Sequence, residues 1–113
     1  MTCIFCQIAN GEIPATLLHQ DDEIIAFNDI DPKAPHHILI IPREHISTIN
    51  DLKTEQSHLI SKMVMSAQKI AKSIGVSEGG YRLVMNCNQD GGQAVYHIHL
   101  HLLGGRVLHW PPG

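Results

Sequence analysis

The sequence predicts an α+β domain in which a mostly antiparallel sheet is covered on one face by one long helix. Short apolar stretches separated by turn residues are typical of strands, and one longer segment repeats its apolar residues at helical spacing. The connections are too short for parallel crossovers, apart from the one that contains this helix. At 113 residues the chain has room for a single core, so we expect one domain spanning residues 1–113.

The N-terminal part is predicted to hold a short helix and a hairpin. Residues 3–11 read as a short helical segment ended by Gly11, after which Pro14 forces extended chain. Residues 17–20 and 23–28 read as strands around the turn pair Asp21-Asp22.

A central strand and the long helix follow. Residues 29–35 form a loop, and the apolar run 37–41 is short enough to be a central strand stopped by Pro42. The helix is expected to start near Thr54 as N-cap and to end at Gly75. Its apolar positions predict packing against the sheet: Leu59, Ile60, Met63, Val64, Ala67, Ile70, Ala71 and Ile74.

The C-terminal part is predicted to add two strands. Residues 81–86 alternate as a strand, residues 90–93 read as a Gly-rich turn, and residues 96–103 alternate imidazoles with apolar residues before Gly104-Gly105.

Charge and composition exclude several classes of partner. The net charge of −3 and the absence of a run among eight Lys and Arg argue against nucleic acid and anionic membranes. No stretch approaches the ~18 apolar residues of a membrane span, and the N-terminus lacks the pattern of an export signal, so we expect a cytoplasmic protein. Three cysteines argue against a disulfide framework.

His97, His99 and His101 are the most informative residues of the chain. A strand would place them on one face, ~6.6 Å between successive side chains. A solvated face would rather carry Lys, Glu or Thr, and three imidazoles spanning about 13 Å cannot easily converge on one metal ion. Binding of phosphate, or nucleophilic attack on it, is therefore favoured, with His99 best placed as nucleophile because it has a neighbour on each side.

Small residues precede these histidines. In the segment 90–94, Asp-Gly-Gly-Gln-Ala, backbone amides can approach an oxyanion closely, although a glycine pair between strands is more often only a turn.

The run 97–103, His-Ile-His-Leu-His-Leu-Leu, resembles the signature of the histidine triad (HIT) family. Its flanks, residues 91–93 and 104–106, resemble the Hint branch, the purine nucleoside phosphoramidate hydrolases. Further matches are residues 27–30, 34–35, 41–47 and 109–113. The resemblance implies a five-stranded antiparallel sheet with one long helix and a short N-terminal helix, dimerising into a ten-stranded sheet. It implies a homodimer that hydrolyses the P–N bond of purine nucleotide substrates, releasing AMP, with no cofactor required for catalysis.

The resemblance also implies a role for each matched residue. His99 would be the transiently adenylylated nucleophile, His101 would contact the phosphate and assist the leaving group, and the His97 carbonyl would orient His99. Asp29 would hold the ribose hydroxyls. The other nucleotide contacts would come from Ile4, Phe5, Ile8, Phe27 and Ile30 around the purine, from Asn86, Gly92, Gln93 and the amide of Ala94 at the α-phosphate, and from Trp110 in a tail near the partner's site.

The pair Cys3 and Cys6 has the spacing of half a zinc site. Some histidine triad proteins that carry this pair bind zinc, and the resemblance implies His45 and His97 as the other two ligands here. The alternative is a pair of small buried thiols.

The sequence is compatible with two further functions. One is a Fhit-like dinucleoside polyphosphate hydrolase, which Gly104-Gly105 and the Trp110 tail disfavour. The other is a nucleotide- or zinc-binding interaction protein without turnover. Ala94 stands where several Hint enzymes carry Ser, and the lost hydroxyl removes a hydrogen bond worth ~0.5 to 1.5 kcal/mol, so the leaving-group preference is undetermined.

Overall fold

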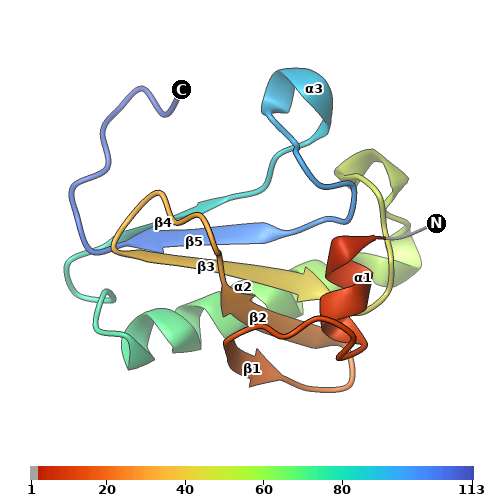
Figure 1. The fold of residues 1–113 in the computed structure, drawn as a ribbon. Helices are drawn as coiled ribbons and strands as arrows, with labels where there is room; N and C mark the ends of the chain where they lie inside the picture. The colour runs from red at the N-terminus through yellow and green to blue at the C-terminus, as the bar shows by residue number, and fades with distance from the viewer. Residues whose placement is uncertain (1–2) are drawn as a thin grey trace.

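The computed structural model describes residues 3–113 and divides them into short helices, strands and one long helix (Figure 1). In chain order the elements are α1 (Ile4–Ala9), β1 (Leu17–Gln20), β2 (Ile24–Asn28), β3 (His36–Pro42), the 3₁₀ turns η1 (Ile49–Asp51) and η2 (Thr54–Gln56), α2 (Ser57–Ser73), β4 (Tyr81–Val84), α3 (Asn88–Gly91) and β5 (Leu100–Gly104).

The strands form one sheet in the order β1-β2-β3-β5-β4, and every neighbouring pair is antiparallel. The predicted five-stranded antiparallel sheet with one long helix is confirmed. The apolar run 37–41 lies in β3, the central strand, as expected. No helix in the described part of the chain has the length and apolar character needed to cross a bilayer.

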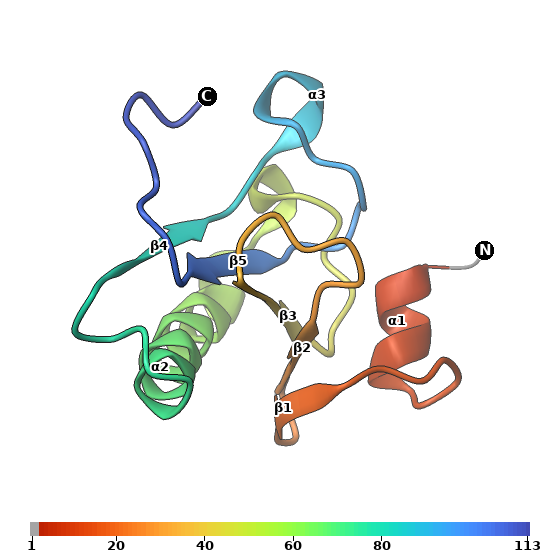
Figure 2. The same ribbon diagram turned by 60° about the vertical axis from the view of Figure 1, so that its left-hand side comes forward.

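The sheet lies between α2 on one face and α1 on the other, as Figure 2 shows. Successive strand residues point to opposite faces of the sheet. Since a helix covers each face, both sets of side chains in the central strands are apolar. On β2, Ile24 and Ala26 pack with α2, whereas Ile25 and Phe27 pack with α1. The strands are therefore continuous apolar runs, and α1 covers the face on which the triad histidines lie.

The long helix differs from its prediction at its start and on one side. Thr54 is not its N-cap: it opens η2, and the helix begins at Ser57. The Gln56 side chain accepts a hydrogen bond from the Lys53 amide at 2.9 Å, which stabilises the tighter turn. Val64 is 42% exposed, so its predicted place in the core is wrong. Gly75 follows the helix with φ of 83°, as its left-handed role requires.

The C-terminal strands are shorter than predicted. β4 ends at Val84, residues 88–91 form α3 rather than belonging to an open turn, and β5 begins only at Leu100. The β3–β5 ladder starts at the pair Ile40 and Leu100, since further along Pro42 has no N–H to donate. His97 and His99 therefore precede the strand, although the alternation of faces continues through them.

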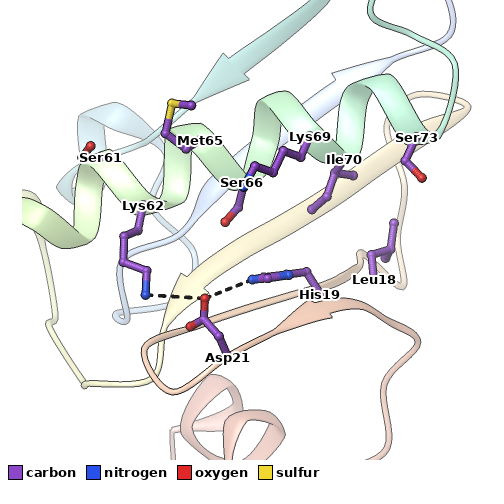
Figure 3. Close-up of a pocket in the computed structure, with 10 residues that line it drawn as sticks. All are labelled: Leu18, His19, Asp21, Ser61, Lys62, Met65, Ser66, Lys69, Ile70 and Ser73. Carbon is purple, nitrogen blue, oxygen red and sulfur yellow. Dashed lines mark hydrogen bonds and ion pairs between the residues drawn. The ribbon is translucent and has the colours of Figure 1, made fainter.

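Asp21 ties the β1–β2 turn to α2 (Figure 3). Its Oδ1 accepts hydrogen bonds from the amides of Glu23 and Ile24, both at 2.8 Å, and its Oδ2 lies 3.2 Å from His19 Nε2 and 3.5 Å from Lys62 Nζ. Burial raises the pKa of Asp21, but these hydrogen bonds and the Lys62 cation together lower it well below its usual value.

Replacing Asp21 by Ala should lower the free energy of unfolding by about 1–2 kcal/mol, because two backbone amides lose their acceptor. Since the folded-state pKa is depressed, this stabilisation is fully present above the unfolded value near ~4 and is lost progressively as the pH falls from there through the folded-state pKa, so it is partly lost at pH 3. Urea unfolding at pH 7 and pH 3 measures both effects. Asp22→Ala is the control, because the Asp22 side chain is 91% exposed. Equal free energies of unfolding for the two variants would contradict the stabilising role of Asp21.

Candidate functional site

A pocket of about 320 Å³ opens on the α1 face of the sheet, beside the triad. It brings together most of the residues predicted from the sequence. The lining residues are Ile4, Phe5 and Ile8 of α1, Ile13, Pro14 and Ala15 of the following loop, Phe27, Asn28, Asp29, Ile30 and Leu39 around β2 and β3, and Ala94, Val95, His99 and His101 near β5. A hollow of about 420 Å³ beside α2, drawn in Figure 3, contains none of the triad histidines; its lining mixes apolar side chains with lysines, serines, His19 and Asp21.

His99 presents an unprotonated nitrogen to this pocket. Its Nδ1 lies 2.8 Å from the carbonyl oxygen of His97, and because a carbonyl can only accept, Nδ1 carries the hydrogen. Burial lowers the pKa of His99, outweighing the opposite effects of that hydrogen bond and of Asp29, so the ring is neutral at pH 7. Its Nε2 therefore carries a lone pair that is available for attack on an electrophile.

His101 presents the opposite tautomer through a chain of hydrogen bonds. The amide of Lys33 donates to His37 Nδ1 at 3.0 Å, so His37 carries its hydrogen on Nε2. His37 Nε2 donates in turn to His101 Nδ1 at 2.8 Å, which leaves the hydrogen of His101 on Nε2. This Nε2 is buried and has no partner within residues 3–113. A buried donor without a partner indicates a place for an acceptor atom of a ligand.

Burial also keeps His101 neutral. Together with repulsion from His99 and His37 it lowers the pKa of His101 to about 4, against the opposing effect of Asp29. The site thus holds a neutral acceptor, His99 Nε2, next to a neutral donor, His101 Nε2–H, with ring centroids 4.9 Å apart. This pair can attack an electrophilic centre and hydrogen bond to one of its oxygens.

His37 was not predicted as a site residue. It is buried, and its Nε2 also lies 3.4 Å from Asp29 Oδ2, so it connects the carboxylate at the pocket mouth to His101. A signal was present in the sequence, because a histidine that opens a buried apolar strand needs a polar partner on the same face.

His97 is fully buried and turns its ring away from the pocket, towards Cys3 and Cys6. Its Nε2 donates to the carbonyl oxygen of Pro42 at 2.7 Å, so its Nδ1 has no hydrogen and carries a lone pair. That Nδ1 lies 3.5 Å from Cys3 Sγ and 3.6 Å from Cys6 Sγ, and Cys6 Sγ lies 3.3 Å from His45 Nδ1.

These four side chains have the geometry of a zinc site. Their ligand atoms all lie within 4.8 Å of one another. Tetrahedral zinc with Zn–S of ~2.3 Å and Zn–N of ~2.05 Å separates sulfur from nitrogen by ~3.6 Å, which the observed distances match.

A second group, Asp29, His37 and His101, also places three ligand atoms within 4.8 Å. Its donors are already engaged: His37 Nε2 and His101 Nδ1 share a hydrogen bond of 2.8 Å, whereas two nitrogens on one zinc ion lie ~3.3 Å apart. The backbone amide of Lys33 also donates a hydrogen bond to His37 Nδ1. If His37 bound a metal through Nε2, its hydrogen would have to lie on Nδ1, where this contact leaves no room for it. This group fits a hydrogen-bond chain better than a metal site.

Four predicted nucleotide contacts do not line the pocket: Asn86, Gly92, Gln93 and Trp110. The side-chain Nε2 of Gln93 donates to the backbone carbonyl oxygens of Ser47 and Val95, and its Oε1 accepts from the backbone N–H of Asn88. The side chain of Gln93 therefore fixes the loop before the triad. Gly92 ends α3 with φ of 81°. Trp110 is 80% exposed in the C-terminal tail. Their roles towards a ligand stay predictions.

The opposite tautomers of His99 and His101 can be measured by long-range ¹H–¹⁵N correlation of the imidazoles at pH 7. We expect the hydrogen on Nδ1 in His99 and on Nε2 in His101 and His37, because each ring has a hydrogen-bond partner whose role as donor or acceptor is fixed. The half-exposed His36 should show averaged tautomers. A hydrogen on His101 Nδ1 would contradict the hydrogen-bond chain described above.

Known proteins resemble this chain in sequence and structure. A family model described as "Scavenger mRNA decapping enzyme C-term binding" matches residues 2–108. The purine nucleoside phosphoramidase of Escherichia coli strain K12 is 53% identical over 105 residues, covering 93% of this chain and 88% of the relative.

Solved structures agree with these relatives. A HIT family hydrolase from Legionella pneumophila Philadelphia 1 superposes with a TM-score of 0.97 at 58% identity, covering 99% of this chain and 100% of the other. A histidine triad protein from Clostridium difficile superposes with a TM-score of 0.94 at 45% identity, covering 96% and 95%.

Proposed function

The chain belongs to the histidine triad family, and we propose that it is a hydrolase that cleaves the P–N bond of purine nucleoside 5′-phosphoramidates. The observation that carries the proposal is the lone pair of His99 Nε2 next to His101 Nε2–H, which has no hydrogen-bond partner in the described part of the chain. The similarity to a purine nucleoside phosphoramidase supports this substrate class.

The pocket offers a surface for a purine nucleoside. Phe5 and Phe27 meet edge to face with ring centroids 5.5 Å apart, and aliphatic side chains from α1 surround them. A flat apolar base gains stability by leaving water for such a surface. The Asp29 carboxylate at the pocket mouth is an acceptor suited to ribose hydroxyls.

In the proposed reaction, His99 Nε2 attacks the α-phosphorus without first losing a proton. His101 Nε2–H hydrogen bonds to a phosphoryl oxygen, keeps its hydrogen and so assists departure of the amine. As the P–N bond breaks, the nitrogen leaves as the amine with a proton taken from solvent. The product is a nucleotidyl-histidine, in which the His97 carbonyl stabilises the cationic His99 ring through its hydrogen bond at Nδ1. Water then attacks the phosphorus, so that a P–O bond forms as the P–Nε2 bond breaks. The water gives one proton to solvent, AMP is released and His99 is again neutral.

We propose that residues 1–113 act as one domain within a homodimer. β4 pairs only with β5 among the described strands, so its other edge is open to a second copy. Pairing two such edges would give a ten-stranded sheet. The exposed Trp110 tail follows β5 and starts beside this edge, with the Arg82 guanidinium of β4 lying 6.0 Å from the indole.

Incubation with adenosine 5′-phosphoramidate in the presence of chelator should yield AMP and a protein adenylylated on His99. His99→Ala should lower kcat/KM by about 10³-fold or more and abolish the adduct, because the attacking nitrogen is gone. Chromatography of AMP and intact-protein mass spectrometry measure the two effects.

His58→Ala, an exposed imidazole on α2, is the matched control and should leave both unchanged. Binding of the substrate by the wild type without turnover would contradict the enzymatic proposal. Faster turnover of diadenosine polyphosphates than of phosphoramidates would favour the polyphosphate hydrolase.

We further propose that Cys3, Cys6, His45 and His97 bind zinc. The thiolates come from the N-cap and the first turn of α1, and the imidazoles come from the segments after β3 and before β5. The fit of the S–N distances and the free Nδ1 of His97 support this site. Such an ion would supply structural cross-linking between α1 and the segment before β5.

Cys3→Ser and Cys6→Ser should each reduce bound zinc from about one ion per chain to a small fraction, because a tetrahedral site cannot be completed by three ligands of this set. Elemental analysis after dialysis against zinc measures the occupancy. Cys87→Ser, a half-buried thiol outside the cluster, should keep the wild-type value. Equal zinc contents in wild type and all variants would show that Cys3 and Cys6 are partly buried thiols that bind no zinc.

A further inference from the structure

Helix α1 supplies three apolar side chains of the pocket but is too short to be stable alone. It has six residues, whereas isolated helices are marginal below ~12. Ile4, Phe5 and Ile8 all project from it into the pocket wall. The position of this wall therefore depends on contacts that hold the helix against the rest of the chain.

The N-terminal end of α1 is held by the Cys3 and Cys6 contacts with His97 and His45 described above. At its C-terminal end Ala9 packs in the apolar cluster with Ile25 and Ile41, and Arg43, which follows β3, adds a hydrogen bond. Arg43 Nη1 donates to the carbonyl oxygen of Ala9, the last residue of α1, at 2.6 Å. Carbonyls in the last helical turn have no partner inside the helix, so this bond acts as a C-terminal cap.

The remaining donors of Arg43 fix the guanidinium relative to the hairpin. Nε donates to the Asp21 carbonyl oxygen at 2.7 Å, and Nη2 donates to Gln20 Oε1 at 3.0 Å. The Arg43 backbone is itself held by its amide, which donates to the Glu23 carbonyl oxygen at 2.8 Å. All three side-chain partners are uncharged oxygens, so the planar fork acts by geometry and not by ion pairing.

We propose that Arg43 is a positioning residue for the base pocket: by capping α1 against β1 and the β1–β2 turn, it sets the affinity for the nucleoside. The inference rests on the proposed function of the pocket. Arg43 is not among the residues that line the pocket, and its side-chain hydrogen bonds within residues 3–113 go to Asp21, Ala9 and Gln20, not to the triad. His99 Nδ1 donates to the His97 carbonyl oxygen and His101 Nδ1 accepts from His37, and neither of these two hydrogen bonds involves Arg43 or the C-terminal end of α1. The contacts of α1 with the triad come from its other end, where Cys6 lies beside His97 and Phe5 beside His99.

This separation predicts an effect on binding rather than on chemistry. Arg43→Ala should raise the KM for adenosine 5′-phosphoramidate and the Kd for AMP about tenfold, with kcat changed less than about threefold. Arg43→Lys, which retains one charged donor, should recover part of the loss. Lys72→Ala, an exposed cation on α2, is the matched control and should behave as the wild type.

Amide hydrogen exchange without ligand tests the anchoring by itself. In Arg43→Ala the amides of residues 7–10 should exchange faster, while α2 and β3 keep their protection. All variants are compared at the same zinc concentration, and Arg43→Lys provides the comparison if the Ala variant does not fold.

Unchanged exchange in α1, or faster exchange with an unchanged Kd for AMP, would overturn the inference. Faster exchange over the whole chain would also overturn it, because it would show a general structural role. If the wild type neither binds AMP nor cleaves the substrate, the proposed function fails, and the exchange result still decides whether Arg43 holds α1.

Discussion

The hydrogen bond from His99 Nδ1 to the carbonyl oxygen of His97 determines what this site can do. A backbone carbonyl has no hydrogen to give, so it fixes the tautomer of the ring without any titratable partner. The Pro42 carbonyl does the same for His97. Both carbonyls are free to accept imidazole hydrogens because the ladder between β3 and β5 begins only at Leu100. The end of a sheet ladder thus sets the protonation pattern of the triad.

Much of this arrangement follows from sequence patterns. The apolar runs in β2 and β3, the helical spacing that ends at Gly75, and the alternation of histidines with apolar residues each predict an element or face that the structure contains. They are predictable because burial on one or two faces leaves a period in the sequence.

The remaining features depend on contacts between distant segments. Thr54 has the properties of an N-cap, but the Gln56 side chain stabilises a 3₁₀ turn before the helix. The start of β5 depends on Pro42 of another strand, and the orientation of Gln93 depends on the Ser47 carbonyl. His37 is recognisable as a site residue only after the sheet register brings it to His101. Local periodicity carries no information about such partners.

The wall that α1 gives to the pocket has a consequence for the order of folding. Cys3 contacts His97, 94 positions further along the chain, while β5 lies between β3 and β4 in the sheet. Contacts of such long sequence separation form late, because the intervening chain must first be ordered. A nascent chain can already pack α1 against Ile25 and Phe27 of β2, but the contacts of α1 with His97 and His99 must wait until nearly the whole sequence has been made. The pocket is among the last parts of the molecule to assemble, and a truncated chain lacking β5 cannot complete it.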